Sequence, residues 1–293
     1  MRSFSGTRGL LVLAGSLFLF SAASAAPAPG TSRPPTRPDV RSSAALVVDA
    51  TDSSVLFAQR DDVAVPIASI TKLMTALVIL EGKQPLNEVL TITSDDRDTE
   101  RGSSSRLAPG TRLPRGELLH LALMSSENRA AHALGRNYPG GLPAFVRAMN
   151  AKAGALGMAS SRFTDPTGLS SHNVASARDL VKLVRAASAA PLIRRYSTDE
   201  RHTVAAGRRS LEFRNTNALV TRPDWNIAVQ KTGYTQDAGE CLVMHTRIED
   251  RSVVIVLLNS FGKQTRVADA RRIRKWMEAA ARQPAPLARP VRG

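Results

Sequence analysis

The position of the apolar, β-branched segments constrains the fold most, because these segments lie at both ends of the chain. Two short ones near the start, 44–49 (AALVVD) and 55–59 (VLFAQ), are separated by residues that favour a turn, which predicts a β-hairpin. Three longer ones lie near the end, at 225–232, 240–248 and 251–259. The connection Glu249-Asp250 predicts a tight turn between the last two. We therefore expect one antiparallel sheet assembled from both ends of the folded domain.

Helical patterns fill the middle of the chain. Residues 70–80 carry apolar side chains at positions 70, 73, 74, 77 and 78, the spacing of a buried helix. Similar patterns predict further elements, namely helices at 116–125, 129–135, 142–157 and 176–189, a closing amphipathic helix at 267–281 and a short strand at 86–93. The expected fold class is α/β (α+β), with helices packed on the sheet and a mostly helical insert between its strands.

The first 25 residues have the features of a signal peptide. Arg2 and Arg8 flank the start of an apolar run at 9–20, and Ala23-Ser24-Ala25 matches the small-residue cleavage pattern. The run is shorter than the roughly 20 residues that span a bilayer, which favours cleavage over the alternative of an uncleaved anchor. We expect a periplasmic protein without a transmembrane anchor after cleavage, either free or associated with the surface of the wall or membrane.

Proline-rich segments border the predicted domain. Residues 26–41 are expected to form an extended linker, and residues 283–293 a basic, proline-rich tail. The folded domain is therefore expected to span 42–282.

Composition excludes several classes of function. The formal net charge is +15, but the basic residues are scattered and aromatic residues make up only 4% of the chain, which argues against nucleic acid as a partner. The single cysteine, Cys241, excludes an intrachain disulfide and is expected to be a buried thiol. The five histidines form no H-x-x-x-H pair, and each is expected to be a surface or satisfied core residue. No phosphate-binding loop or dinucleotide fingerprint is present, so we expect neither a metal nor a cofactor.

One short motif combines a nucleophile with a base. Ser69-Ile70-Thr71-Lys72 places a hydroxyl and an amine one helical turn apart at the start of a predicted helix. Serine needs a base within hydrogen-bond reach, and lysine can be that base only where desolvation or a nearby cation lowers its pKa. Alone the motif is weak, because Ser260-Phe261-Gly262-Lys263 has the same spacing. Lys72 by itself could also be a structural lysine with a buried stem.

Two further motifs could complete a site. Ser126-Glu127-Asn128 lies in the break between two predicted helices and offers a hydroxyl for proton relay and an amide to hold Lys72 and a substrate backbone. Ser171-His172-Asn173 has the same pattern, and either could be a helix N-cap. Lys231-Thr232-Gly233 occurs once, at the end of an apolar strand. There it could present a cation and a hydroxyl to a carboxylate, or form an ordinary turn.

The order of the three motifs is more informative than any one of them. Class A β-lactamases and penicillin-binding proteins carry three motifs in this order: S-x-x-K at a helix start, S-x-N between helices and K-T-G on a late strand. The motif at Ser260 follows K-T-G and begins no apolar helix, so the order excludes it. Over about 44–259 the chain resembles the low-molecular-mass penicillin-binding proteins of the D-alanyl-D-alanine carboxypeptidase/endopeptidase family. The similar segments include PIASITKLMT (66–75), GSSSRL (102–107) and DPTGL (165–169), and 231–244 is especially similar to the endopeptidase branch.

The resemblance implies a role for each residue of the first two motifs. Ser69 would attack the penultimate D-alanine carbonyl and form an acyl-enzyme. Lys72 would take the proton of Ser69, and Ser126 would pass a proton to the leaving amine. Asn128 would orient Lys72 and the peptide.

The resemblance also implies that the K-T-G segment binds the substrate. Lys231 and Thr232 would hold the terminal carboxylate, and Gly233 would leave room for the peptide backbone. The N–H of Tyr234 would form the oxyanion hole together with that of Ser69. Lys231 would also help to keep Lys72 neutral.

The resemblance also implies a β-lactamase/transpeptidase-like fold and a penicillin-sensitive serine DD-peptidase. Its substrates would be peptidoglycan stem peptides, cut at D-Ala-D-Ala ends or at D-Ala–diaminopimelate cross-links, and β-lactams would be covalent inhibitors. Glu127 departs from the S-G-N or S-D-N of many relatives and adds bulk and charge near the cleft. The chain has no E-x-x-L-N segment for a deacylating glutamate, which argues against a β-lactamase.

Two alternatives remain at this level. One is a β-lactamase or esterase on the same scaffold. The other is a catalytically silent peptidoglycan-binding module, against which the intact Ser69, Lys72 and Lys231 argue. The lack of a second apolar span or further domain and the stretch 234–244 favour the endopeptidase branch, while the cut made in vivo, the oligomeric state and the role of the termini stay open.

Overall fold

The computed structural model describes residues 37–207 and 209–282, together with Met1. Most of the predicted signal peptide, residues 26–36 of the linker and the tail at 283–293 lie outside the described residues. The expectations for those segments therefore stay predictions.

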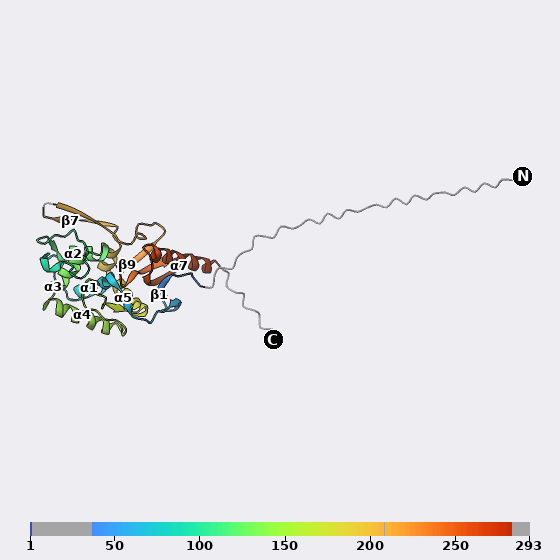
Figure 1. Cartoon of the computed structure of the whole chain (residues 1–293), viewed down its shortest axis with the longest axis horizontal. Helices are drawn as coiled ribbons and strands as arrows, with labels where there is room; N and C mark the ends of the chain where they lie inside the picture. The colour runs from blue at the N-terminus through green and yellow to red at the C-terminus, as the bar shows by residue number, and fades with distance from the viewer. Residues whose placement is uncertain (2–36, 208, 283–293) are drawn as a thin grey trace. The chain divides into compact units, whose positions relative to one another are not determined.

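A five-stranded antiparallel sheet combines strands from both ends of the chain (Figure 1). Its strands in spatial order are β2 (Val55–Gln59), β1 (Ser42–Asp49), β11 (Arg251–Ser260), β10 (Gly239–Ile248) and β9 (Asn226–Thr235). The sequence predicted all five. Ser42 lies opposite Ser260 and Asp49 opposite Val253, so the two ends of the domain pair along the full length of β1. This confirms the predicted fold class.

The sheet is buried on both faces, because successive side chains of a strand point to opposite sides. In β1, Leu46 packs in the larger core together with the helical insert, whereas Val47 packs in a smaller core on the opposite face. The smaller core is closed by α7 (Thr265–Ala281), which contributes Ile273. The sheet is therefore the middle layer between α7 and the insert.

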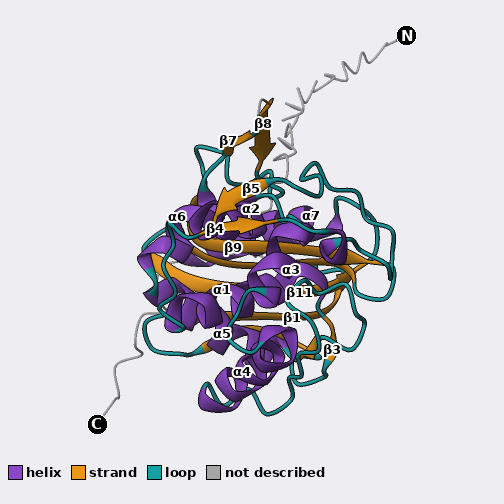
Figure 2. Cartoon of the chain, turned by 90° about the vertical axis from the view of Figure 1, so that its left-hand side faces the viewer, coloured by secondary structure: helices purple, strands orange, loops and turns teal. Residues whose placement is uncertain are grey.

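The insert is mostly helical, as predicted, and lies in front of the sheet in Figure 2. Its helices are α1 (Thr71–Glu81), α2 (Arg115–Met124), α3 (Asn128–Arg136), α4 (Gly141–Ala155), α5 (Ala177–Ala189) and α6 (Pro191–Thr198). The sequence predicted all of these except α6. Residues Thr71–Ile79 of α1 are all buried, so this helix is enclosed by the domain and any polar group on it must find a partner inside.

The smaller strands differ more from expectation. The strand predicted at 86–93 is reduced to β4 (Val89–Thr91), paired with β5 (Arg112–Pro114). The hairpin of β7 (Arg201–Ala206) and β8 (Arg209–Arg214) was not predicted. Within its strands only Val204 and Phe213 are buried, so the sequence lacks the alternating apolar pattern of a half-buried strand. A further short pair joins β3 (Val65–Pro66) and β6 (Val174–Ala175).

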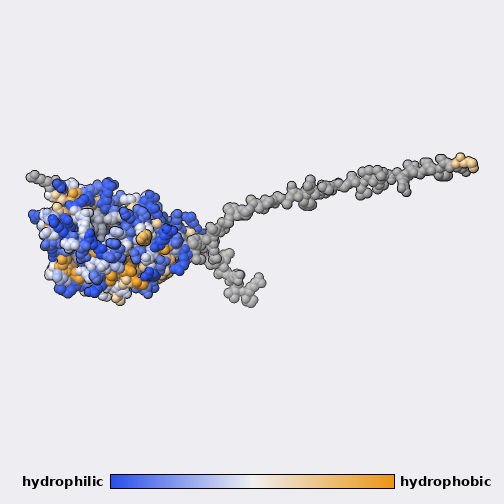
Figure 3. All heavy atoms as spheres, in the orientation of Figure 1, coloured by the Kyte–Doolittle hydropathy of each residue, from blue (hydrophilic) through white to orange (hydrophobic). Residues whose placement is uncertain are grey.

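Three further features concern the surface and the interior of the described chain. Within the described part of the chain, no helix has both the length and the apolar character that a membrane crossing requires. Hydrophilic residues cover most of the face shown in Figure 3. Cys241 is buried and free, as expected.

Candidate active site

Ser69 and Lys72 lie in direct contact at the start of α1. Ser69 belongs to a short 3-10 turn, η1 (Ala68–Ile70), that leads into the helix. The Nζ of Lys72 lies 2.7 Å from the Oγ of Ser69. Lys72 is fully buried and Ser69 is half-buried, so the amine of this pair is shielded from water.

Two more oxygens complete the surroundings of the Lys72 amine. Oδ1 of Asn128 and the backbone oxygen of Thr167 each lie 2.7 Å from Nζ. The backbone oxygen can only accept, and Asn128 presents its oxygen because its Nδ2 donates to Ser103 Oγ at 2.9 Å. These two acceptors occupy two N–H bonds of the amine. Ser69 Oγ is then the one partner of the three with which Lys72 can exchange a proton.

Burial lowers the pKa of Lys72 to about 7, although Asp165 and Glu127 oppose the shift through their charges. A large share of the lysine is therefore neutral near pH 7 and has a lone pair available to accept a proton. The neutral amine can accept from Ser69 while it donates to Asn128 and Thr167. The ammonium can donate to all three.

Ser126 lies in the sharp break between α2 and α3. Its φ of +61° is in the left-handed region, which is strained for serine, as is the φ of +49° at Ala68 beside the nucleophile. Glu127 ends this break as the N-cap of α3 and accepts from the N–H groups of Arg129 at 2.7 Å and Ala130 at 3.2 Å. Its carboxylate also bonds the hydroxyl of Ser105. Glu127 does line the cleft, as expected, but its charge is engaged by the start of the helix.

Lys231 lies on β9 and reaches the second serine. Its Nζ donates to Ser126 Oγ and to the backbone oxygen of Thr232, both at 2.9 Å. Burial, followed by repulsion from Lys72 and Arg266, lowers the pKa of Lys231 well below its ordinary value. Repulsion between two buried ammonium groups favours states in which at least one of them is neutral. The arrangement gives each serine of the site its own lysine.

The rest of the K-T-G segment runs directly against the turn that carries Ser69. A Cβ on Gly233 would lie 2.9 Å from the backbone oxygen of Ile67 and 3.2 Å from the nitrogen of Ser69, so a larger residue would push the two backbones apart. Thr232 shares a 2.6 Å hydrogen bond with Thr216. Tyr234 follows at the end of the segment with 64% of its surface exposed.

Arg266 anchors the K-T-G strand from the opposite face of the sheet. Its Nη1 donates to the backbone oxygens of Gly233 at 2.7 Å and Cys241 at 3.1 Å, and it pairs with Glu240. With Lys72 and Lys231, it places three basic side chains at or behind the K-T-G strand, and an anionic group bound there would favour their charged forms.

A cavity of about 770 Å³ opens beside Ser126. Residues 104–106 form one part of its lining, residues 125–128 the second and residues 210–214 of β8 the third. A smaller cavity of about 370 Å³ includes Asn128 and Thr167 and carries acidic residues, among them Asp95 and Asp98.

Sequence reasoning missed three residues that hold the Lys72 amine in place. Thr167 supplies its backbone oxygen, Ser103 fixes the amide of Asn128, and the Asp165 carboxylate accepts from the N–H groups of Thr167 at 2.6 Å and Gly168 at 2.8 Å. All three lie in segments, GSSSRL and DPTGL, that carry the family resemblance. Their signal was present, but nothing local in the sequence connects them to Lys72.

The competing motifs lie elsewhere. Ser260 shares its hydroxyl with Ser42 at 2.6 Å inside the sheet, and Lys263 is exposed. Asn173 is buried, and its side chain bonds the Asp165 carboxylate and the N–H of Thr164. Neither motif forms a serine–lysine contact in the described residues.

Comparisons with known proteins cover most of the chain. Residues 31–262 match the family model described as D-alanyl-D-alanine carboxypeptidase. The chain is 49% identical over 271 residues to a D-alanyl-D-alanine endopeptidase of Pseudomonas aeruginosa, which covers 92% of this chain and 87% of that protein. It is 46% identical over 254 residues to an Escherichia coli protein with the same description, covering 86% of this chain and 82% of that one.

Solved structures share the architecture. A Streptomyces DD-transpeptidase superposes with a TM-score of 0.77 at 24% identity, covering 83% of this chain and 99% of that chain. A D-alanyl-D-alanine carboxypeptidase of Mycobacterium tuberculosis superposes with a TM-score of 0.75 at 29% identity, covering 86% of this chain and 94% of that chain. The predicted β-lactamase/transpeptidase-like fold is thereby confirmed.

Proposed function

Because the chain belongs to the D-alanyl-D-alanine carboxypeptidase family and is a serine DD-peptidase, we propose that it cleaves peptidoglycan stem peptides after D-alanine through an acyl-enzyme on Ser69. The observation that carries this proposal is the position of the Lys72 amine. Two of its three hydrogen-bond partners can only accept, and the third is the hydroxyl of Ser69. A buried lysine with a pKa of about 7 in that position is suited to activate the serine.

In the acylation step, neutral Lys72 accepts the proton of Ser69 while Oγ attacks the D-alanine carbonyl carbon. The new ammonium keeps Asn128 and Thr167 as acceptors, so the charge forms at a site that already has its hydrogen bonds. Collapse of the tetrahedral intermediate breaks the C–N bond. In the second step a water, activated by Lys72, attacks the ester, and Ser69 regains its proton.

The leaving amine must receive a proton as the C–N bond breaks. We assign this transfer to the hydroxyl of Ser126, which the 2.9 Å bond from Lys231 orients. The ammonium of Lys72 returns to Ser126 the proton that it took from Ser69, so Lys72 is neutral again for the second step. The strained φ of Ser126 supports this role, because strain of this kind persists where the surroundings hold a functional group in place.

The K-T-G segment binds the substrate in this proposal. A substrate carboxylate beside Lys231 and Thr232 would raise the pKa of Lys231 again and return it to the ammonium, while Lys72 stays neutral. The backbone N–H groups of Ser69 and Tyr234 stabilise the oxyanion. The close approach of Gly233 to the Ser69 nitrogen supports the pairing of these two donors.

We further propose that cross-linked peptides are preferred over free D-Ala-D-Ala ends. The relatives described as endopeptidases share more identity with this chain than those described as carboxypeptidases. The cavity of about 770 Å³ beside Ser126 offers room for a leaving group much larger than alanine. We also expect export to the periplasm, on the basis of the N-terminal sequence features.

The acyl-enzyme can be tested by intact mass. Wild-type protein incubated briefly with benzylpenicillin should gain one adduct per chain, Ser69→Ala should gain none, and Ser260→Ala should behave as wild type because that serine is enclosed in the sheet. An adduct on folded Ser69→Ala, or none on the wild type, would contradict the assignment. Rapid loss of the adduct with turnover of a chromogenic cephalosporin would instead indicate a β-lactamase.

The substrate preference needs a direct competition. Purified muropeptides, one a cross-linked tetrapeptide dimer and one a pentapeptide monomer, are supplied together and followed by chromatography. The dimer should disappear with the higher kcat/KM. Faster release of free D-alanine from the monomer would overturn the endopeptidase proposal and leave the serine mechanism intact.

A further inference from the structure

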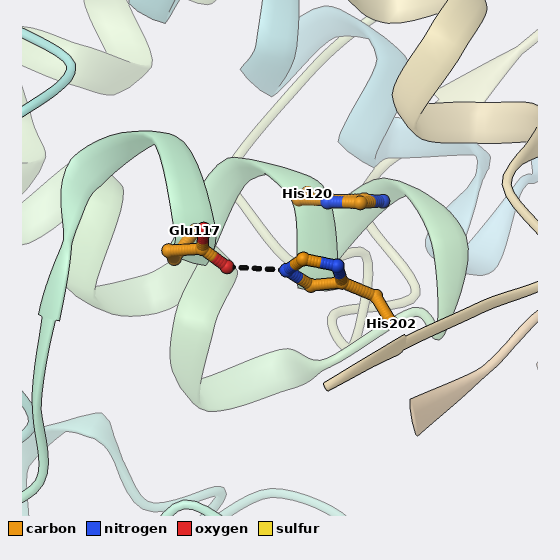
Figure 4. Close-up of side chains that lie close together, drawn as sticks. All are labelled: Glu117, His120 and His202. Atoms are coloured by element: carbon orange, nitrogen blue, oxygen red, sulfur yellow. Dashed lines mark hydrogen bonds and ion pairs between the residues drawn. The ribbon is translucent and has the colours of Figure 1, made fainter. Parts of the chain in front are cut away.

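A second cluster of titratable side chains lies outside the active site, between α2 and the β7–β8 hairpin. Glu117 and His120 are one helical turn apart on α2, and His202 reaches them from β7 (Figure 4). One potential ligand atom from each residue lies within 4.8 Å of those of the other two. Nε2 of His202 contacts the Glu117 carboxylate at 2.5 Å, the contact drawn as a dashed line.

His120 is the least satisfied member of this cluster. Its side chain is only 5% exposed, and its Nε2 has no hydrogen-bond partner among the described residues. Asp199 approaches that nitrogen to 3.0 Å, but outside hydrogen-bond geometry. A buried polar nitrogen without a partner carries an energetic cost that a bound cation would remove.

Two aromatic rings pack against the ring of His120. Its ring stacks on Tyr196 at a centroid distance of 4.3 Å and lies 4.1 Å from the ring of His202.

We propose that Glu117, His120 and His202 bind one divalent transition-metal ion, with Zn²⁺ the ion that fits this set of donors. Two histidines and one glutamate are a known zinc ligand set, and ligands in a tetrahedral site lie about 3.4 Å from one another at Zn–ligand distances of about 2.0–2.2 Å. The rings of His120 and His202 lie 4.1 Å apart at an angle of 31°, so metal binding requires the side chains to turn until their ligand atoms converge. Asp199, whose carboxylate lies 3.0 Å from Nε2 of His120, is a further oxygen donor at the edge of this cluster.

The site connects to the cleft through the hairpin. His202 lies directly opposite Phe213 in the β7–β8 pairing, and Phe213 belongs to the stretch of β8 that lines the cavity beside Ser126. A metal held by α2 and β7 would therefore fix the position of one wall of the cleft. The same three residues without a metal would form only an ion pair and a ring stack, and the experiment must separate these two cases.

Zinc binding can be measured on the mature chain, purified without a histidine tag and stripped with a chelator. Titration with Zn²⁺ should show one equivalent bound, and Co²⁺ should give the visible absorption of a tetrahedral site. Glu117→Gln and His202→Gln should each weaken binding by at least about 10-fold. Both side chains are part-exposed, so these variants are expected to fold. His172→Gln, which removes an exposed imidazole, serves as the matched control and should bind as wild type.

Backbone exchange gives a second measurement that does not depend on activity. Zn²⁺ should slow hydrogen exchange at amides of 201–206 in the wild type and leave them unchanged in Glu117→Gln. Binding no weaker in Glu117→Gln and His202→Gln than in His172→Gln would overturn the proposal. A wild type that does not bind one equivalent of Zn²⁺ would also overturn it, and the cluster would then act as an ion pair alone.

Discussion

Gly168 offers the sharpest test of how the nucleophile turn is supported. Its φ is +84°, and a Cβ there would lie 1.9 Å from the backbone oxygen of Ala68, immediately before Ser69. Real Cβ contacts essentially never fall below 3.0 Å, so Gly168→Ala requires the two segments to separate by roughly 1 Å. Because Ala68 already has a positive φ, the turn has little freedom to adjust without moving Ser69.

The expected effect has two parts. Alanine in the left-handed region costs roughly 1–2 kcal/mol of stability at any site. The clash adds about 1–3 kcal/mol, as for other overpacked positions. A displacement of about 1 Å at the reacting group lowers catalysis by about 10²-fold. Gly168→Ala should therefore unfold more easily and acylate with benzylpenicillin about 100-fold more slowly.

Gly110→Ala is the matched control. Gly110 has a φ of +89°, but nothing lies within 4 Å of the position that its Cβ would occupy. It should show the backbone penalty alone, with acylation at the wild-type rate. Urea unfolding and acylation time courses followed by mass measure both parts. Acylation of Gly168→Ala within threefold of Gly110→Ala would refute the view that this contact positions Ser69.

Three further predictions follow from the surroundings of the buried groups. The acylation rate should rise with pH and level off above a midpoint near 7, because burial lowers the pKa of Lys72 to about 7 and only the neutral amine accepts a proton. Acylation rates measured between about pH 5 and about pH 9 check this. A midpoint near the ordinary lysine pKa would contradict it. Asn128→Asp should move that midpoint upward by roughly 1–3 pH units, because it places a carboxylate beside Nζ of Lys72. Glu127→Gln should move it downward, because a negative charge that favours the ammonium is lost. The same pH profiles measure both shifts, and shifts of the opposite sign would refute the electrostatic account. Cys241 should react with iodoacetamide at about pH 8 on the order of 100-fold more slowly in the native chain than in urea, because burial raises its pKa to about 11. The rate of alkylation is followed by intact mass. Equal rates in the two conditions would show that the strand pairing around Cys241 opens readily.

The main elements were predictable because their signals are local. The length and β-branched residues of apolar runs such as 251–259 favour a buried strand, and the spacing of Leu73, Met74 and Leu77 specifies one face of a helix. The β7–β8 hairpin was missed because most of its side chains are exposed on both faces, so burial left no alternating pattern in the sequence. α6 was missed because it is one of the shortest helices and buries only Ile193 and Ser197.

The sequence by itself determined the identities and order of the proposed site residues, since Ser69, Lys72, Ser126 and Lys231 each lie in a short motif. Only the tertiary structure decided what those groups can do. The pKa of Lys72 depends on the burial of its side chain and on the charges of Asp165 and Glu127, which lie far from it in the sequence. One acceptor of its amine, the backbone oxygen of Thr167, comes from 95 positions away. Burial and electrostatic contacts depend on which distant segments the fold brings together, and no local pattern records them.

The histidine cluster shows the same limit. The sequence contains Glu117 and His120 one helical turn apart, but His202 follows Glu117 by 85 positions, and the sequence analysis treated each histidine as isolated. Packing of the unpredicted hairpin against α2 brings the third potential ligand into place. A ligand set is a property of distances in space, and these distances exist only once the chain has folded.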